Sequence, residues 1–330
     1  MKSKKVKPEP VDNTGQVIIN KKQKSRWERT KAAFFDCWQL YLLLLLPMLY
    51  MLVFHYFPMY GAQIAFRDYK PVDGIWGSEW VGFEHFIRFF DYYQFKDIML
   101  NTLEISIYGL IVGVPFPVIL AILLKYCPNK KFGKGVQIIT YAPHFISVVV
   151  MVSIIMKTLD PRNGLINNVL ALFGIEYNLN LLAMPEAFSS VYVWSGIWQT
   201  MGFSAIIYIA ILTGVDVSLH EAAMVDGANV VQRIRHIDFP ALIPQITILL
   251  ILSLGRILNV GFEKTLLMQN SLNASASEVI STYVYKMGIA ASFPDVSYTS
   301  AVGLFQSVIA FILIFVVNKL ARKYGEMSLW

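Results

Sequence analysis

Six long apolar stretches constrain this 330-residue chain more than any other feature of its sequence. A helix needs about 20 apolar residues to cross the hydrocarbon of a bilayer, where backbone groups must find their hydrogen bonds within the helix. The chain is 56% hydrophobic and only 15% charged, which is too little charge to cover a soluble core of this content. The sequence therefore predicts an all-α membrane protein with six transmembrane helices, at about 38–57, 102–124, 136–156, 189–213, 242–261 and 299–320.

Positive charge is distributed unevenly between the connecting segments. Nineteen of the 28 Lys and Arg residues fall in or beside the N-tail, the loop 126–135, the loop 214–241 and the C-tail. Cytoplasmic segments carry the excess of Lys and Arg, so these four are expected in the cytoplasm. The prediction is a multi-pass protein of the cell membrane with both termini cytoplasmic. It has a disordered basic tail over 1–36, a membrane domain over 37–320 and a C-tail over 321–330.

The loop 214–241 carries the most specific motif of the chain. It reads Glu221-Ala222-Ala223, then Gly227, then Ile237-Asp238-Phe239-Pro240. The loop is too polar for lipid but repeats apolar residues at helical spacing, which indicates two short surface helices. The small Ala222 and Ala223 would let the first helix lie in a groove on a partner, and Glu221 would offer that partner a carboxylate.

Local signals in this loop predict where the two helices begin and end. Ser218 is expected to cap the first helix, and Gly227 to supply the turn between the two. An alternative role for Glu221 is to close a capping box with Ser218. The second helix is expected to turn Val230, Val231, Ile234 and Ile237 inward and Gln232, Arg233 and Arg235 outward. Pro240 and Pro244 would then stiffen the return into the membrane.

This motif resembles the pattern EAA, three residues, G, nine residues, I-x-L-P of the membrane permeases of type I binding-protein-dependent ABC importers. Phe239 stands where leucine is usual. The stretches 80–86 and 101–103 resemble the approach to the second span of carbohydrate permeases, and the likeness covers about residues 40–330. Within that group the chain is most similar to permeases for oligosaccharides and polysaccharide fragments such as uronides.

The resemblance implies the type I ABC importer permease fold, with six transmembrane helices and a cytoplasmic coupling helix. It implies a pore shared with a second homologous permease subunit, an ABC ATPase dimer below it, and an extracellular solute-binding protein that delivers a sugar or oligosaccharide. The residues that would couple the pore to the ATPase are Glu221, Ala222, Ala223, Gly227, Ile237 and Pro240.

No catalytic residue and no cofactor are expected on this chain. Its nearest approach to a phosphate-binding loop is Phe132-Gly133-Lys134-Gly135, which lacks the upstream glycine and the hydroxyl residue of Gly-x-x-x-x-Gly-Lys-Ser/Thr. ATP and Mg²⁺ would therefore bind to the partner ATPase, and this chain would be a non-catalytic permease subunit. Histidines and carboxylates at metal-ligand spacing are absent from the sequence, so no metal is expected.

Polar residues at membrane depth are the candidates for a substrate pathway, because a charge at the centre of a helix costs about 2.5–3.5 kcal/mol on insertion. The candidates are Glu104, Tyr108, Tyr141, His144, Trp194, Trp198, Gln199, Arg256 and Asn259. Glu104 and Arg256 either neutralise each other or leave Arg256 to bind an acidic sugar. Trp194 and Trp198 share a helix face, where they either stack on sugar rings or serve as packing residues.

Other local patterns predict structure rather than chemistry. Pro143 before His144 predicts a kink in the third span, and Gly109 with Gly113 predicts close helix packing in the second. The aromatic-rich segment 59–101 fits an interfacial aromatic belt, with contact to an external partner as the alternative.

The sequence also bears on three alternative functions: a membrane enzyme, a channel or carrier that works alone, and a permease for a solute other than sugar. A multi-pass enzyme acting on lipid-linked sugars would need clustered carboxylates or histidines, whereas Asp216, Asp226 and Asp238 are spread along their loop. A solitary channel or carrier would show inverted repeats, which are not evident. A permease for a non-sugar solute stays open as an alternative. The net charge of +6 does not indicate nucleic acid, because the cations flank the spans.

Overall fold

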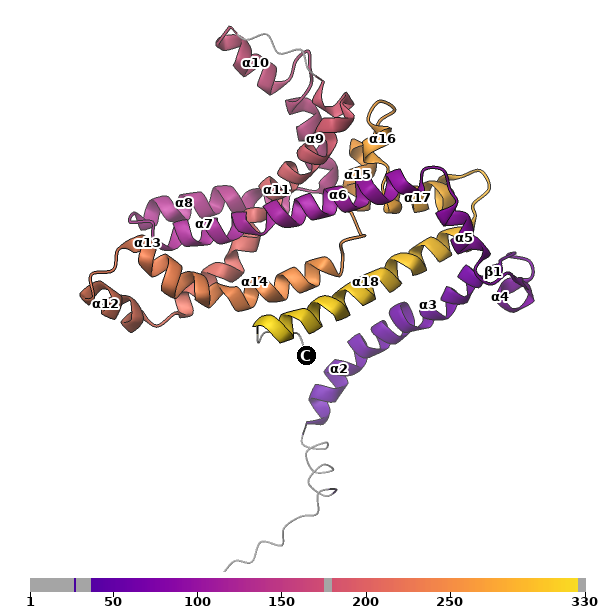
Figure 1. Cartoon of the computed structure of the whole chain (residues 1–330), viewed down its shortest axis with the longest axis horizontal. Helices are drawn as coiled ribbons and strands as arrows, with labels where there is room; N and C mark the ends of the chain where they lie inside the picture. The colour runs from indigo at the N-terminus through magenta and orange to yellow at the C-terminus, as the bar shows by residue number, and fades with distance from the viewer. Residues whose placement is uncertain (1–26, 28–36, 175–179, 326–330) are drawn as a thin grey trace, which may run out of the picture. The chain divides into compact units, whose positions relative to one another are not determined.

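The computed structural model describes residues 27, 37–174 and 180–325 (Figure 1). The predicted basic tail 1–36, apart from Trp27, and the end of the C-tail, 326–330, lie outside the described residues. The chain forms two compact units, residues 1–61 and 62–330.

From residue 37 onward, the described part of the first unit forms one helical run. It comprises α2 (Trp38–Met51), η1 (Leu52–Tyr56) and α3 (Phe57–Met59), and it continues into η2 (Tyr60–Phe66). Together they make a 29-residue apolar helix over Trp38–Phe66, long enough to cross a membrane. No residue of α2 is buried, as expected of a leucine-rich surface that faces lipid.

The second unit begins with a small hairpin. The strands β1 (Arg67–Asp68) and β2 (Glu79–Trp80) pair antiparallel, and α4 (Gly74–Gly77) lies between them in the chain. The Arg67 guanidinium donates a hydrogen bond to the Ser78 carbonyl at 2.8 Å, and Trp80 stacks on Phe66. The short α5 (Glu84–Phe90) follows and leads into the bundle.

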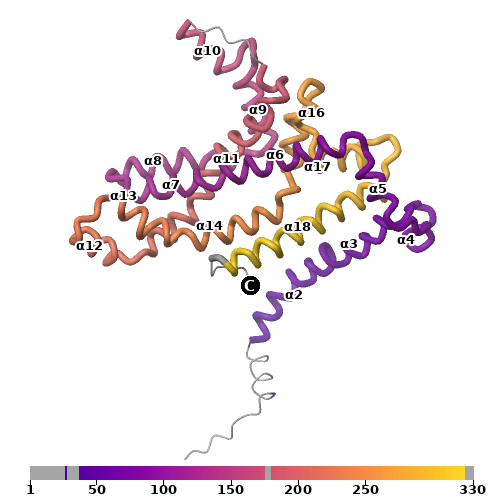
Figure 2. Tube along the Cα trace, in the orientation of Figure 1, coloured from indigo at the N-terminus to yellow at the C-terminus, as the bar shows by residue number. Residues whose placement is uncertain are grey.

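The bundle of the second unit is entirely helical (Figures 1 and 2). Its elements are α6 (Phe95–Gly113), α7 (Pro115–Lys125), α8 (Lys130–Tyr141), η3 (Ala142–Phe145), α9 (Val148–Thr158), α10 (Leu165–Leu172), η4 (Leu181–Ala183), α11 (Pro185–Gly214), α12 (Val217–Val225), α13 (Val230–Arg233), η5 (Ile234–Asp238), α14 (Phe239–Leu254), α15 (Phe262–Met268), α16 (Ala274–Ser277), α17 (Ile280–Tyr285), η6 (Lys286–Ala290) and α18 (Val296–Gly325).

Within the described ranges, five helical runs are long and apolar enough to cross a membrane, and a bent pair makes a sixth if it is counted as one span. Pro115 stands at the first position of α7, where its missing N–H divides α6 from α7 within one 31-residue run, Phe95–Lys125. The bent pair is 130–145 with 148–158, and its halves meet at 107°. The kink predicted at Pro143 is thus a full break. A new helix starts after it, with the Ser147 hydroxyl accepting a hydrogen bond from the Val150 amide.

The fifth span lies earlier in the sequence than its hydropathy suggests. The helix runs over Val230–Leu254, whereas the apolar stretch was placed at 242–261. The polar first turns belong to the same helix because α13, η5 and α14 are continuous. Arg256 and Asn259, expected within this span, therefore lie in the turn beyond its end at Gly255.

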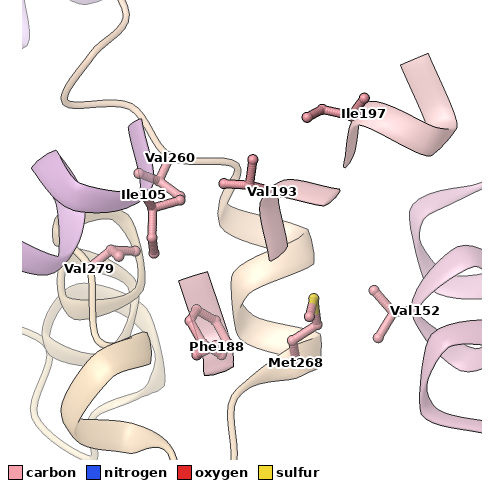
Figure 3. Close-up of a cluster of buried hydrophobic side chains, with 8 residues drawn as sticks. All are labelled: Ile105, Val152, Phe188, Val193, Ile197, Val260, Met268 and Val279. Carbon is pink, nitrogen blue, oxygen red and sulfur yellow. The ribbon is translucent and has the colours of Figure 1, made fainter. Parts of the chain in front are cut away.

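The main core of the unit joins helices that are distant in sequence. Figure 3 shows the cluster, whose buried members are Ile105, Val152, Phe188, Val193, Ile197, Val260, Met268 and Val279. α11 lies at its centre and also packs tightly on α8, where a Cβ at Gly202 would come within 2.1 Å of the Thr140 carbonyl oxygen. The close approach therefore occurs at Gly202. The predicted packing glycines behave differently, since a Cβ at Gly113 would meet nothing within 4 Å and one at Gly109 only an ordinary contact with Val193.

Candidate functional site

The motif loop lies at one end of the second unit. Figure 1 shows α12 and α13 there, beside the connection between α7 and α8, while α5 and α17 lie at the opposite end. The Asp216 carboxylate caps α12 by accepting a hydrogen bond from the Ser218 amide at 2.9 Å, and this bond lowers the pKa of Asp216. The predicted cap, Ser218, is instead the second residue of the helix, so the Ser218–Glu221 capping box does not form. The Glu221 side chain is exposed.

The turn after α12 requires its glycine. Gly227 has a φ of +80°, in the left-handed region that L side chains rarely adopt. Its amide donates to the Met224 carbonyl at 3.1 Å, and the Ala228 amide donates to the Ala223 carbonyl at 2.8 Å. This pair of bonds is a Schellman motif, which ends the helix and pairs carbonyls that would otherwise lack donors. Gly227 thus forms the turn between the two helices, as the sequence predicts.

The second helix of the loop departs from its predicted orientation. It starts with a capping box in which the side chains of Asn229 and Gln232 bond each other's backbone amides. Val230 and Val231, expected to face inward, are 43% and 70% exposed. The fully buried residue is Asp238, because the π-helical turn η5 shifts the inward face by a residue. Ile237 is half-buried, and Pro240 is exposed at the start of α14.

Arg256 lies on a cavity of about 400 Å³ within the second unit. The polar lining comprises Arg256, Ser106, Ser204, Ser253 and Tyr208, contributed by α6, α11, α14 and the turn that follows α14. Gly109 and Gly113 line the same space, which explains why their face carries no close helix contact. One guanidinium and several hydroxyls are thus gathered around a volume that could hold a sugar residue.

Glu104 and Arg256 do not form an ion pair among the described side chains. Glu104 is exposed on α6, and it does not line the Arg256 cavity. The mutual neutralisation of Glu104 and Arg256 is therefore not found in the described part of the chain, and a role of Arg256 toward substrate stays a prediction. Asn259 is also exposed, three residues further along the same turn.

The two tryptophans belong to a different surface. Trp194 and Trp198 line an apolar groove with Ile154, Ile155 and Leu159, away from the Arg256 cavity. The Trp194 indole also donates a hydrogen bond to the Tyr108 hydroxyl at 2.9 Å and meets Phe116 edge-on. Both indoles remain about half exposed, at 45% and 42%.

Three of the remaining candidates lie near the break in the third span. The His144 ring stacks on Phe203 with centroids 3.9 Å apart. Gln199 donates from Nε2 to the Ile146 carbonyl at 2.9 Å, which satisfies a backbone acceptor freed where the helix is interrupted. Tyr141 is half-buried at the last turn of α8. The Gln199 amide therefore bonds within the protein, and the His144 ring packs against Phe203.

Lys264 is a buried cation that the sequence analysis did not single out. It lies on α15, its exposed fraction is 8%, and its ammonium donates to the Tyr192 carbonyl at 2.6 Å. Gly196 makes room for it, since a Cβ there would be 3.2 Å from Nζ. No carboxylate pairs with Lys264 among the described residues. Burial lowers the pKa of Lys264 to about 7.

This shift predicts a pH-dependent stability. The folded pKa of Lys264 lies below that of an exposed lysine, so the unfolded chain binds more protons above about pH 7. The free energy of unfolding should therefore increase as the pH rises from 7 to 9, and it should decrease as the pH is lowered toward the folded pKa of Lys264. The measurement is the melting temperature in detergent across this range. Lys264→Met should raise it at pH 7 and flatten its slope, and an unchanged slope would contradict the assignment.

No group of three or more His, Cys, Asp or Glu residues within the described ranges could hold a metal ion. The assembled features are thus a helical loop with an exposed carboxylate, a cavity with one guanidinium, and a bundle of membrane-spanning length.

Comparison with known proteins identifies the family. Residues 110–326 match the family described as binding-protein-dependent transport system inner membrane component. The chain is 40% identical over 313 residues to the polygalacturonan/rhamnogalacturonan transport system permease protein YteP of Bacillus subtilis, covering 95% of this chain and 96% of that protein. It is 41% identical to the protein LplB of Bacillus subtilis, covering 89% and 92%.

A solved structure is similar over nearly its whole length. It is a bacterial ABC transporter involved in the import of the acidic polysaccharide alginate, with a TM-score of 0.81 at 35% identity over 90% of this chain and 99% of that one. The chain therefore belongs to the family of binding-protein-dependent transport system inner membrane components, and it has the type I ABC importer permease fold. The predictions of fold class and of a membrane-spanning permease of an ABC sugar importer are confirmed.

Proposed function

We propose that this chain forms one half of the translocation pore of an ATP-driven importer for acidic oligosaccharides. The observation that carries the substrate class is the cavity in which Arg256 stands beside Ser106, Ser204 and Ser253. A guanidinium binds a carboxylate through two parallel hydrogen bonds, and serine hydroxyls both donate to and accept from sugar hydroxyls. The substrates in the names of YteP and the alginate transporter are acidic polysaccharides, which supports the same class.

The partners follow from the motif loop. We propose that α12 docks on one subunit of an ABC ATPase dimer through Glu221, Ala222, Ala223 and Gly227, with Ile237 and Pro240 anchoring the return to the membrane. A second homologous permease subunit would complete the pore, and an extracellular solute-binding protein would deliver the sugar. ATP and Mg²⁺ would bind to the ATPase, leaving this subunit without catalysis. The exposure of Glu221 at the end of the bundle supports this arrangement (Figure 2).

We propose that both termini and the motif loop are cytoplasmic. Lys130, Lys131 and Lys134 at the start of α8 lie at the same end of the second unit as α12 (Figure 1). Clustered cations of this kind favour the cytoplasmic side.

Co-purification tests the docking role. Glu221→Ala removes the exposed carboxylate without exposing a cavity, so the chain should fold and insert normally. Recovery of the ATPase with the tagged permease should fall about tenfold, the size expected for the loss of a hydrogen bond to a charged group. Glu186→Ala, an exposed glutamate in the first turn of α11, is the matched control and should recover the ATPase fully. Equal recovery in both variants would count against the docking role.

Uptake measurements test the substrate class. Arg256→Ala should reduce the uptake of galacturonate oligomers about tenfold, because a hydrogen-bonded charge pair is lost, and should leave uncharged oligomers of equal length unaffected. The readout is transport into vesicles that contain the complete importer. Arg162→Ala, an exposed arginine after α9, is the control for loss of charge. Unchanged selectivity in the Arg256 variant would show that the cavity does not read the carboxylate.

A further inference from the structure

A buried carboxylate follows the motif loop at the point where the chain enters α14. The Asp238 side chain is fully buried. Its Oδ1 accepts from the Lys125 ammonium at 2.5 Å, and its Oδ2 accepts from the Tyr126 hydroxyl at 2.6 Å. A buried charge is tolerated only when it is paired and hydrogen-bonded, so these two donors hold Asp238 in place.

Lys125 is the centre of this group of residues. Besides Asp238, its ammonium lies 3.1 Å from His220 Nε2 and donates to the Leu212 carbonyl at 3.2 Å. An ammonium has three N–H donors and no acceptor, so Lys125 has a donor for each of these three partners. His220 Nε2 also lies 3.3 Å from Asp238 Oδ1, so the ring contacts both members of the ion pair. Leu212 lies in the last turn of α11, where carbonyls have no partner within the helix. We call Lys125, Tyr126, His220 and Asp238, with the Leu212 carbonyl, the Lys125 network.

The Lys125 network joins four elements that are separate in sequence. Lys125 ends α7, Leu212 lies near the end of α11, His220 is in α12 and Asp238 ends η5. No residue of α12 is fully buried, and the His220 side chain is 12% exposed. His220 also immediately precedes Glu221, the residue proposed to meet the ATPase. The hydrogen bond at His220 therefore ties the docking helix to the ends of two membrane helices.

Two local features keep the Lys125 network in this arrangement. The π-helical turn η5 adds a residue to the turn before Asp238, and one residue corresponds to a rotation of about 100° around a helix. Tyr126 stays protonated and remains a donor, because burial and its hydrogen bond to Asp238 raise the pKa of Tyr126 to about 12. The Arg233 guanidinium lies over the Tyr126 ring, 5.8 Å from its centroid.

We propose that the Lys125 network is the linkage through which a displacement of α12 moves α7, α11 and α14 together. The proposal rests on the proposed docking of α12 on the ATPase, and it assigns His220 and Lys125 as positioning residues that need not touch ATPase or substrate. A hydrogen-bonded group with fixed donors and acceptors resists sliding, whereas the exposed apolar side chains of α12 alone would not. Loss of the linkage should leave docking intact and uncouple ATP hydrolysis from transport.

His220→Ala is the sharpest variant, because it cuts the linkage to α12 while the Lys125–Asp238 ion pair remains. The assay uses the complete importer in proteoliposomes and measures uptake of galacturonate oligomers per ATP hydrolysed. We expect the ATPase to remain bound and active in this variant, and the uptake per ATP to fall about tenfold. His220→Asn offers an acceptor oxygen in a similar place and should recover most of the ratio. His236→Ala is the matched control, since His236 is exposed and bonds only within its own helix.

Lys125→Met is a second variant with a different readout. It removes all three donors and leaves the Asp238 carboxylate buried without its cation, so the melting temperature in detergent should fall as well as the uptake per ATP. Replacing both charges, as Lys125→Met with Asp238→Leu, should restore the melting temperature without restoring the ratio.

The outcomes separate this inference from the proposed function. A wild-type uptake per ATP in His220→Ala would overturn the linkage and leave the docking role untouched. Loss of ATPase binding in His220→Ala would also overturn it, because His220 would then be a docking residue. A normal ratio in the double variant would reduce the Lys125 network to a structural role. Failure of the wild-type chain to bring down an ATPase would instead contradict the proposed function.

Discussion

Replacing Gly227 with tryptophan is expected to lower substrate uptake about a hundredfold, equivalent to about 2.7 kcal/mol of lost coupling. Two effects combine. At a φ of +80° an L side chain strains the backbone by about 1–2 kcal/mol, which loosens the Schellman turn that ends α12. A Cβ at this position would meet nothing within 4 Å, so the indole would project into open space beside α12, the helix proposed to dock on the ATPase.

The measurements for this prediction are uptake and ATPase recovery in the same vesicles. Gly174→Trp is the matched control, because Gly174 also has a positive φ, +72°, with open space around it, and lies after α10. Gly227→Asn should retain uptake within about threefold, since asparagine tolerates the left-handed conformation. Normal uptake in Gly227→Trp would contradict both the docking role and the importance of this turn.

Replacing Gly202 with leucine should prevent α8 and α11 from packing. Even the first carbon of a side chain would lie 2.1 Å from the Thr140 carbonyl oxygen and 2.9 Å from its Cβ. The obstacle at 2.1 Å is backbone, which cannot rotate away as a flexible side chain can. Overpacking of this kind costs about 3 kcal/mol or more, so folded protein should be recovered in much lower yield and with a lower melting temperature.

Gly113→Ala is the stability control for the Gly202 variant. Nothing lies within 4 Å of its added Cβ, and alanine is the better helix former by up to about 1 kcal/mol. Its melting temperature should be equal to that of the wild type or higher. A Gly202→Leu protein as stable as this control would show that the two helices do not approach each other as closely as the structure indicates.

The sequence was informative where a single local rule determined the outcome. Apolar length alone predicts the membrane-spanning helices, and the spacing of Glu221, Gly227 and Pro240 predicts a helix, a turn and a second helix. Gly227 follows from one such rule, because its left-handed conformation excludes most other residues.

Expectations failed where several local rules competed. Asp216 and Ser218 are both good helix caps, and only the structure shows that Asp216 takes the role. Hydropathy predicts Arg256 within the fifth span. The helix instead starts earlier, at polar residues, and ends at Leu254, so Arg256 lies beyond it. A Gly-x-x-x-Gly pattern does not specify whether its face meets a helix or a cavity. Gly109 and Gly113 line a cavity, and the close helix contact is made at Gly202.

The Lys125 network was missed because its members come from distant parts of the sequence. A carboxylate in the stretch Ile237-Asp238-Phe239-Pro240 was the available signal, since an acidic residue between apolar neighbours needs a buried partner. Sequence alone could not identify that partner as Lys125, 113 residues earlier. Lys264 was missed for the same reason, because its burial depends on how α15 packs against distant parts of the chain.

The 30 residues of α11 correspond to a helix about 45 Å long, at 1.5 Å per residue. Other segments contact α11 at three positions. The Leu212 carbonyl accepts a hydrogen bond from Lys125, Gly202 lies against the Thr140 backbone, and Gln199 donates to a carbonyl at the break in the third span. The close contact at Gly202 lies between the two ends of the helix. A displacement near Leu212 would therefore be carried by one helix to Phe188, Val193 and Ile197, which α11 contributes to the buried core cluster.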